Sequence, residues 1–259
     1  MVATGISRGT PPSAGTLARG GKRALLVLVL AFAIGAPASG APATTTEHSA
    51  TLAQLFSARD AQSLERTLPA DRVLRFRVRE PEGGVRGVLV YVSPTDSGEL
   101  PVDWVGVIDR EHLLYVGADG FGNSHPTAER VLVALAADRL ARQMGAKDAR
   151  RFIAGMSGGG RVASQVITHF PQVFAGAICI VGADYFMPQD ETQRAAVAAR
   201  RLVLLTGSRD FNQREIQLVS RRYQQAGVTR LLLMDLPGYA HQLPDPSQLT
   251  QALAFLDAS

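Results

Sequence analysis

Residues 153–161 read Ile-Ala-Gly-Met-Ser-Gly-Gly-Gly-Arg, and this stretch limits the fold more than any other in the chain. A short apolar run leads into Gly155-Met156-Ser157-Gly158-Gly159, and a segment with helical spacing follows. A serine at a sharp turn from strand to helix is strained, and its hydroxyl is lifted above the sheet. A side chain at either flanking glycine would collide with the neighbouring strand or the helix start. The pattern therefore predicts a strand, a tight turn bearing Ser157, and a helix.

A second interpretation of the same residues is a glycine-rich turn that happens to contain a serine. In the first interpretation the turn holds a nucleophilic serine, and in the second it only connects a strand to a helix. Ser157 would sit at a helix N-terminus, where free N–H groups and the helix dipole favour negative charge. A serine that forms an oxyanion intermediate needs that environment. The choice depends on the groups that the rest of the chain brings to this turn.

The segments around this turn alternate between strand and helix. Such alternation predicts a mainly parallel sheet with helices on both faces. The fold class we expect is α/β, a three-layer α/β/α sandwich without a large lid domain, and neither an internal repeat nor a second core is evident. Strands are expected over residues 72–80, 85–92, 113–117, 151–155, 174–182, 201–207 and 231–236. Helices are expected within 51–68 and over 127–144, 158–170, 190–199, 211–226 and 246–256, with a short helix or turn over 102–110.

The first 43 residues differ from the rest of the 259-residue chain. A basic lead precedes an unbroken apolar run over residues 24–34, and small residues with A-x-A-like cleavage sites follow. This is the order of a secretory signal peptide, and the run is too short for a membrane span of roughly 20 residues. We expect a signal peptide and basic lead over 1–43, a linker and N-terminal helix over 44–70, and a catalytic domain over 71–259. The mature protein would be secreted or periplasmic, without a stable membrane anchor.

Charge and cysteine content exclude several classes of function. Residues 1–43 hold four of the 27 basic residues and none of the 23 acidic ones, so the remainder carries equal numbers of both. A balanced charge removes the electrostatic argument for nucleic acid as a partner. The single cysteine, Cys179, lies in an apolar stretch and is expected to be a buried small hydrophobe. The five histidines lack the paired spacing of a metal site, and no glycine-rich dinucleotide motif is present, so we expect no metal and no cofactor.

An acid and a base follow Ser157 in the positions that a serine nucleophile requires. Asp210 comes just after the strand over 201–207, and His241 comes shortly after the strand over 231–236. The carboxyl ends of parallel strands meet at one edge of a sheet, so the three side chains are expected to lie together. A neutral imidazole takes the serine proton, and a carboxylate holds the tautomer and stabilises the imidazolium. Asp184, one strand earlier, is the alternative acid, with a helix cap as its other role.

Three motifs in this order resemble the α/β-hydrolase superfamily. They are Gly155-Met156-Ser157-Gly158-Gly159 at the elbow, Gly207-Ser208-Arg209-Asp210, and Gly238-Tyr239-Ala240-His241. The resemblance covers roughly residues 71–259 and is nearest to compact secreted esterases and polyhydroxybutyrate-depolymerase-like members. It implies an oxyanion hole formed by the N–H of Gly158 and a donor on the loop after the strand over 85–92. Many members have His-Gly there, whereas this chain has Ser93-Pro94-Thr95. Proline has no N–H, so Thr95 aligns with the usual donor and Ser93 is second.

These residues predict a serine hydrolase of the carboxylic-ester type, acting on a small-molecule or polymeric ester. Asp119, Asn123, Tyr185 and Trp104 are candidate substrate contacts. A serine peptidase or acyltransferase on the same frame is an alternative. Another is a binding module that lost activity through its altered oxyanion loop. The residues do not specify the substrate or the oligomeric state.

Overall fold

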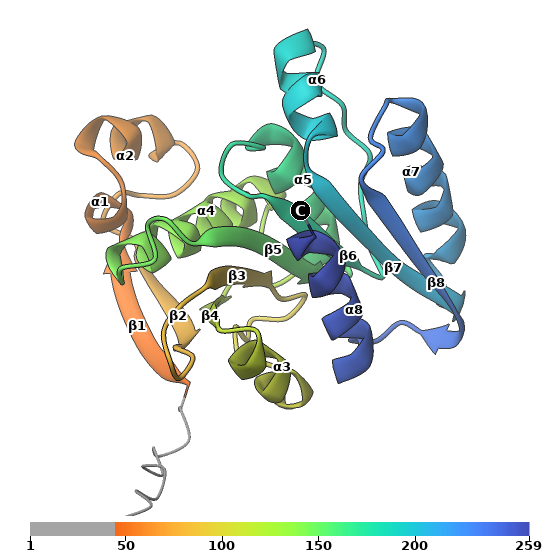
Figure 1. Ribbon diagram of the computed structural model, residues 1–259. Helices are drawn as coiled ribbons and strands as arrows, with labels where there is room; N and C mark the ends of the chain where they lie inside the picture. Colours follow the sequence, from red (N-terminus) through yellow and green to blue (C-terminus); the bar gives the residue numbers. More distant parts are fainter. Residues whose placement is uncertain (1–44, 259) are drawn as a thin grey trace, which may run out of the picture. The chain divides into compact units, whose positions relative to one another are not determined.

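The computed structural model describes residues 45–258, so the expected signal peptide lies outside the described residues. Eight strands form one sheet in the order β1-β2-β4-β3-β5-β6-β7-β8 (Figure 1). β1 and β2 are antiparallel to their neighbours, and all pairs from β4 to β8 are parallel. The mainly parallel sheet expected from the alternating pattern is therefore confirmed. The strands span Thr46–Thr51, Val73–Arg79, Gly87–Val92, Leu113–Asp119, Arg150–Met156, Gly176–Ile180, Arg201–Arg209 and Leu231–Ala240.

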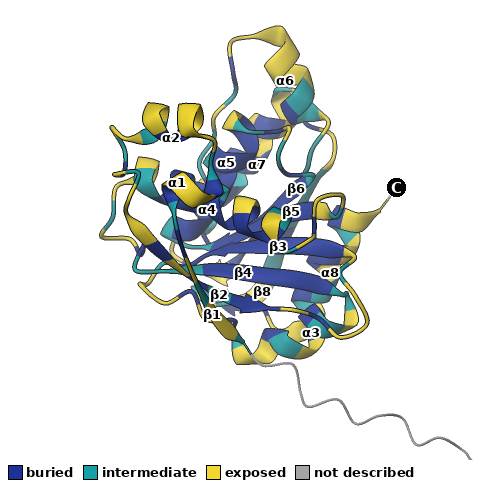
Figure 2. Ribbon diagram, turned by 90° about the vertical axis from the view of Figure 1, so that its left-hand side faces the viewer, coloured by how far each residue is buried: buried dark blue, intermediate teal, exposed yellow. Residues whose placement is uncertain are grey.

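Helices cover both faces of the sheet, as a three-layer sandwich requires. Side chains of α4, α5 and α7 share one core cluster with Val88, Val90 and Val92 of β3. Side chains of α3 and α8 share the other cluster with Leu89 and Tyr91 of the same strand. Successive residues of a strand point to opposite faces, so the wholly apolar β3 supplies both cores, and Figure 2 shows its ribbon as buried. The α-helices α1–α8 span Leu52–Leu55, Ala58–Leu64, Val105–Arg110, Thr127–Gln143, Gly158–His169, Glu191–Ala198, Gln213–Gln225 and Pro246–Asp257, and a 3-10 turn spans Val102–Trp104.

The segment expected as a linker over residues 44–50 contains a strand instead. β1 pairs antiparallel with β2 at the edge of the sheet, from Thr46 opposite Val78 to Thr51 opposite Val73. Ala50 is its one buried residue. An edge strand has one neighbour and buries little apolar surface, so its sequence carries no alternation to reveal it. None of the described helices is long and apolar enough to span a membrane.

The last strand is longer than the sequence predicts, and this difference affects the site. Residues 237–240 were expected in a loop, but β8 continues to Ala240. Its pairing with β7 shifts between Gly207 opposite Leu236 and Arg209 opposite Ala240, so β8 bulges there. Gly238 lies in the bulge at a φ of 73°, and its N–H donates to Ser208 Oγ at 2.8 Å. The bulge therefore delivers His241 from the end of a paired strand.

A buried ion pair ties α4 to β5, the strand that carries Ser157. Asp138 Oδ1 lies 2.7 Å from Arg151 Nε, and both side chains are less than one tenth exposed. The other Asp138 oxygen accepts a hydrogen bond from Arg142 Nε at 2.7 Å. Removing one partner of such a pair leaves an uncompensated charge in the interior.

We therefore expect Asp138→Asn to lower the free energy of unfolding by about 3 kcal/mol, because Arg151 then remains buried without its counter-charge. Urea unfolding followed by circular dichroism measures the change. Asp148→Asn, at an exposed aspartate just before β5, is the matched control and should change stability by less than about 0.5 kcal/mol. Equal effects of the two substitutions would contradict the assignment.

Candidate active site

Ser157 occupies the turn between β5 and α5 and has the strained backbone that the sequence predicts. Its φ is 54° and its ψ is −119°, outside the regions that side-chain-bearing residues ordinarily adopt. Its N–H donates to Ile180 O on the neighbouring strand β6 at 2.8 Å. α5 begins at the next residue, Gly158. The turn is thus a strand–elbow–helix unit with the serine at its apex, and the plain glycine-rich-turn interpretation is not needed.

Glycines allow the backbone around this elbow to pack without side chains. A Cβ at Gly155 would overlap Gly159 O, and one at Gly159 would overlap Val92 O of β3. A Cβ at Gly160 would overlap Gly182 O, and one at Gly182 would overlap Ser157 O. The start of α5 is therefore pressed against the ends of both neighbouring strands, β3 and β6. Each of these contacts is between main-chain atoms, which have little freedom to move aside.

Asp210 and His241 form the acid–base pair at the same edge of the sheet. His241 Nδ1 lies 2.8 Å from Asp210 Oδ1, although 31 residues separate them in sequence. The Asp210 side chain is fully buried, and the His241 side chain is 20% exposed. Thr206 Oγ1 donates to Asp210 Oδ2 at 2.6 Å, and the N–H of Asn212 donates to Oδ1 at 3.1 Å. These bonds fix the carboxylate, which in turn orients the imidazole.

The contact with Asp210 uses Nδ1, so Nε2 is the ring nitrogen left for a serine hydroxyl. Ser157 follows β5 and His241 follows β8, and these parallel strands end at one edge of the sheet. Among the described residues, no hydrogen bond joins the Ser157 hydroxyl to His241. Catalytic hydrogen bonds often tighten only once substrate is bound.

The alternative acid, Asp184, has other partners. Its two carboxylate oxygens accept hydrogen bonds from Arg161 Nη1 at 2.9 Å and from Gln165 Nε2 at 2.8 Å. Arg161 also pairs with Glu215, and this hydrogen bond lowers the pKa of that carboxyl. Asp184 does not cap the next helix either, because α6 has Asp190 as its N-cap. The structure thus gives His241 a single carboxylate partner, Asp210.

The loop expected to complete the oxyanion hole folds back on itself. The N–H of Thr95 donates to Ser93 Oγ at 3.1 Å, and the two hydroxyls lie 3.0 Å apart. This bond occupies the Thr95 amide, so the expectation that it faces a substrate oxygen needs correction. Position in the motif misplaced this donor, because serine hydroxyls readily bond the N–H two residues ahead. Gly158 lies in the first turn of α5, where N–H groups have no partner within the helix.

The four candidate substrate contacts have different surroundings. Asp119 accepts hydrogen bonds from Arg77 Nε at 2.6 Å and from the N–H of Gly98 at 2.7 Å, so it holds the structure together. Trp104 is fully buried, and its Nε1 donates to Pro244 O at 3.0 Å. Full burial rules out Trp104 as a substrate contact, whereas contact between Asp119 and substrate stays a prediction. Asn123 is exposed beside Gly158, and half-buried Tyr185 lies beneath the guanidinium of Arg222, so their contact with substrate stays a prediction.

Solved structures with similar folds include several hydrolases. A dienelactone hydrolase from Anabaena variabilis has a TM-score of 0.55 at 13% identity, over 82% of this chain and 96% of that chain. S-formylglutathione hydrolase from Staphylococcus aureus has a TM-score of 0.56 at 12% identity, over 84% and 99%. A ferulic acid esterase has a TM-score of 0.60 at 16% identity, over 83% and 98%. The chain has the α/β-hydrolase fold.

This likeness establishes the fold, because identities this low do not carry a reaction with them. No protein-family model matches the sequence of this α/β-hydrolase-fold chain, and no curated protein sequence matches it. The nearer resemblance to compact secreted esterases and polyhydroxybutyrate-depolymerase-like members stays a prediction. Within the described residues, no group of three or more His, Cys, Asp or Glu side chains is arranged to hold a metal ion.

Sequence reasoning missed two residues that shape the site. Phe211, directly after the acid, is 78% exposed and stacks on the His241 ring with centroids 4.1 Å apart. Arg130 is buried in α4, where its guanidinium donates to Phe121 O at 3.1 Å and to Ser93 O at 2.9 Å. Arg130 was detectable as an arginine next to Val131 and Leu132 in an amphipathic helix. Phe211 had no signal beyond its place beside Asp210.

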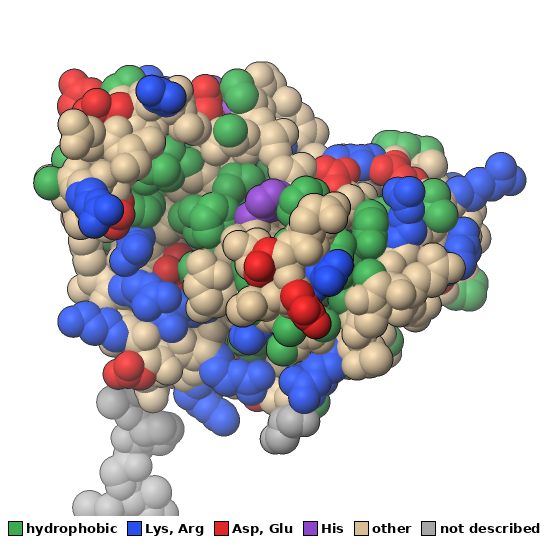
Figure 3. Space-filling view, turned by 90° about the horizontal axis from the view of Figure 1, so that it is seen from above, with side chains coloured by type: hydrophobic (Ala, Val, Ile, Leu, Met, Phe, Trp, Pro, Cys, Tyr) green, Lys and Arg blue, Asp and Glu red, His purple; other side chains and the backbone are tan. Residues whose placement is uncertain are grey.

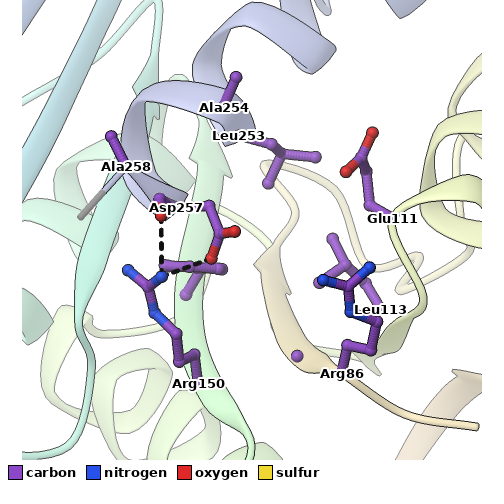
Figure 4. Close-up of a pocket in the computed structure, with 10 residues that line it drawn as sticks. Arg86, Glu111, Leu113, Arg150, Leu253, Ala254, Asp257 and Ala258 are labelled. Atoms are coloured by element: carbon purple, nitrogen blue, oxygen red, sulfur yellow. Dashed lines mark hydrogen bonds and ion pairs between the residues drawn. The ribbon is translucent and has the colours of Figure 1, made fainter.

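A cavity of about 590 Å³ lies away from this site (Figure 4). It is lined by Gly87 at the start of β3, Leu113 at the start of β4 and residues near the end of α8. Arg150 lies on its wall and pairs with Asp257 at 2.6 Å. The amino-terminal ends of the strands form this wall, whereas Ser157 and His241 follow the carboxyl ends. The cavity is therefore at the opposite edge of the sheet and is no substrate pocket for them.

The packing at the elbow predicts the effect of one added methyl group. We expect Gly159→Ala to lower the free energy of unfolding by about 1–3 kcal/mol, because the new Cβ overlaps Val92 O. Thermal and urea unfolding measure this loss. The control is Gly106→Ala at an exposed position of α3, where no atom lies near the added Cβ and helix propensity improves. A Gly159→Ala protein as stable as the control would contradict the packing argument.

Proposed function

We propose that the chain is a serine hydrolase that cleaves carboxylic esters through an acyl-enzyme on Ser157. One observation carries the proposal above all: a histidine bonded to a buried aspartate follows the strand ends at which Ser157 sits on its strained elbow. The set agrees in residue type and chain order with what nucleophilic catalysis by serine requires, which supports the proposal.

Acylation begins when Ser157 Oγ attacks the ester carbonyl carbon and its proton passes to His241 Nε2. The imidazolium that forms lies beside the Asp210 carboxylate, 2.8 Å from its ring nitrogen Nδ1. The former carbonyl oxygen carries the negative charge, and the free N–H of Gly158 donates to it. Collapse of the tetrahedral intermediate breaks the bond to the alcohol oxygen, which takes the proton from His241. The acyl group remains on Ser157.

Deacylation repeats these steps with water as the nucleophile. His241 Nε2 accepts a proton from the water as its oxygen attacks the acyl carbonyl carbon. The second tetrahedral intermediate releases the carboxylic acid, and Ser157 Oγ recovers its proton from His241. Each step uses groups of this chain together with ester and water.

The apolar side chains around the site favour a substrate with an apolar or aromatic portion. Phe211 exposes most of its ring beside His241, which is an unusual place for a large hydrophobic side chain. On the face seen in Figure 3, hydrophobic side chains flank a histidine near the centre. The names of the structural neighbours, among them a ferulic acid esterase and a dienelactone hydrolase, belong to proteins that act on esters. We assign this chain the same broad substrate class.

Export from the cytoplasm is part of the proposal. Its support is the sequence order of the first 43 residues, with a basic lead, an apolar run and small residues in turn. The buried single cysteine fits an exported protein that depends on its core, since Cys179 is fully buried and burial raises its thiol pKa to about 12.

The decisive experiment uses the purified chain with a fluorophosphonate probe and short p-nitrophenyl esters. We expect covalent labelling at Ser157 and ester turnover, and Ser157→Ala should remove the labelling and lower kcat about 10⁶-fold while the fold persists. Mass spectrometry locates the label. Turnover of peptides in preference to esters would indicate the peptidase alternative. Absence of both labelling and turnover would favour a binding module.

The acid is tested by a matched pair of substitutions. We expect Asp210→Asn to lower kcat about 10³–10⁴-fold, because an amide at this position favours the wrong imidazole tautomer and leaves the imidazolium without a counter-charge. Asp184→Asn removes an equally placed carboxylate after the preceding strand, and kcat should stay within about threefold, because Asp184 bonds Arg161 and Gln165 instead. Steady-state kinetics on one p-nitrophenyl ester compares them. The reverse ranking would reassign the acid.

A further inference from the structure

We propose that the side-chain amide of Asn123 is the second oxyanion donor, acting with the N–H of Gly158. This inference rests on the proposed serine-hydrolase function and adds a catalytic residue to it. In the acyl-transfer steps, Asn123 Nδ2–H would donate a hydrogen bond to the oxygen that carries the negative charge. No bond is formed or broken at Asn123 itself.

On the loop after β3, the N–H of Ser93 is the one backbone candidate that remains for the second donor. Pro94 has no N–H, and the N–H of Thr95 is held by Ser93 Oγ at 3.1 Å. An oxyanion with a single donor loses a large share of its stabilisation, since removing one donor commonly costs a factor of 10²–10³ in kcat. A side chain beside Gly158 is the natural candidate for the missing bond.

Asn123 lies directly against Gly158. The space that a Cβ on Gly158 would occupy is filled by the carboxamide of Asn123, whose Oδ1, Cγ and Nδ2 are the three nearest atoms to it. Gly158 is thus a glycine because the amide group of Asn123 stands where a side chain would stand. The absence of a side chain brings the carboxamide next to the residue whose N–H begins the oxyanion hole.

Three contacts fix the Asn123 loop to the loop that follows β3. The N–H of Asn123 donates to Pro94 O at 2.9 Å, and the N–H of Gly122 donates to Asp96 Oδ1 at 2.8 Å. From the buried side, Arg130 bonds Phe121 O and Ser93 O, one carbonyl from each loop. The backbone that carries Asn123 is therefore held in place before substrate arrives, which is the condition for effective electrostatic stabilisation.

The Asn123 carboxamide has no hydrogen-bond partner of its own among the described residues, and the residue is exposed. Two nearby carboxylates differ in this respect, because Asp96 on the loop after β3 and Asp119 at the end of β4 are both engaged by backbone N–H groups. Rotation about the bond between Cβ and Cγ exchanges the positions of Oδ1 and Nδ2 at small cost. The amide is therefore free to turn its N–H towards a developing oxyanion.

Asn123→Asp tests the donor with almost no change in shape. We expect kcat on a p-nitrophenyl ester to fall about 10²–10³-fold with KM within about threefold, because the carboxylate cannot donate and repels the oxyanion. Asn123→Ala should lower kcat by a similar factor without the added charge. Ser124→Ala, an exposed polar neighbour, is the control and should keep kcat within about twofold.

A second measurement separates a catalytic role from a structural one. A phenylboronic acid forms a tetrahedral adduct with the serine, and its inhibition constant should weaken in Asn123→Ala by a factor close to the loss in kcat/KM. The melting temperature should stay near that of the wild type. Unchanged kcat in Asn123→Asp, or a loss confined to KM and melting temperature, would overturn the role of Asn123 while ester turnover by the wild type upholds the proposed function. Absence of turnover in the wild type overturns both.

Discussion

The contact between the start of α5 and the ends of β3 and β6 is the constraint on which the site depends. Main-chain atoms meet there without side chains between them, so Gly155, Gly159, Gly160 and Gly182 have no room for a Cβ. Ser157 lies within this close approach and has a φ of 54°. The core on both sides of β3 and β5 has to hold the strained turn, because strain of this kind persists only where the surroundings over-determine it.

Much of the fold could be predicted because its core strands bury apolar residues on both faces. The strand over Gly87–Val92 and the long helix Thr127–Gln143 follow directly from runs and spacing that burial requires. β1 escaped because an edge strand with one buried residue has no such pattern. The continuation of β8 to Ala240 escaped because its bulge contains Pro237 and Gly238, residues that typically end a strand. The local sequence predicts strands and helices that bury apolar side chains, but it does not predict strands that pair without burying them.

The candidate site likewise has features that the sequence predicts and features that depend on partners distant in sequence. The elbow at Ser157 and the contact between Asp210 and His241 could be predicted, because each of these residues follows a strand and parallel strands bring such positions to one edge of the sheet. The choice of Asp210 over Asp184 depended on partners distant in sequence, such as Arg161 and Gln165 for Asp184. Trp104 was misjudged for a related reason. The sequence does not reveal the hydrogen-bond partners of Trp104 and Asp119. Only the fold shows that the Trp104 indole donates to Pro244 O and that the Asp119 carboxylate accepts from Arg77 Nε.

The proposed oxyanion donor Asn123 is held in place differently from Ser157, Asp210 and His241. Ser157, Asp210 and His241 follow strands, whereas the proposed side-chain donor Asn123 lies on a loop packed against the loop after β3, and these two loops need support of their own. Arg130 supplies that support by bonding one carbonyl from each loop out of contact with solvent, and Asp96 adds two further bonds between them. A charged side chain is rarely buried without a carboxylate partner, and burial lowers the pKa of this guanidinium. The cost of burying Arg130 is understandable if the two loops must keep one fixed geometry, which is what a preorganised oxyanion site demands.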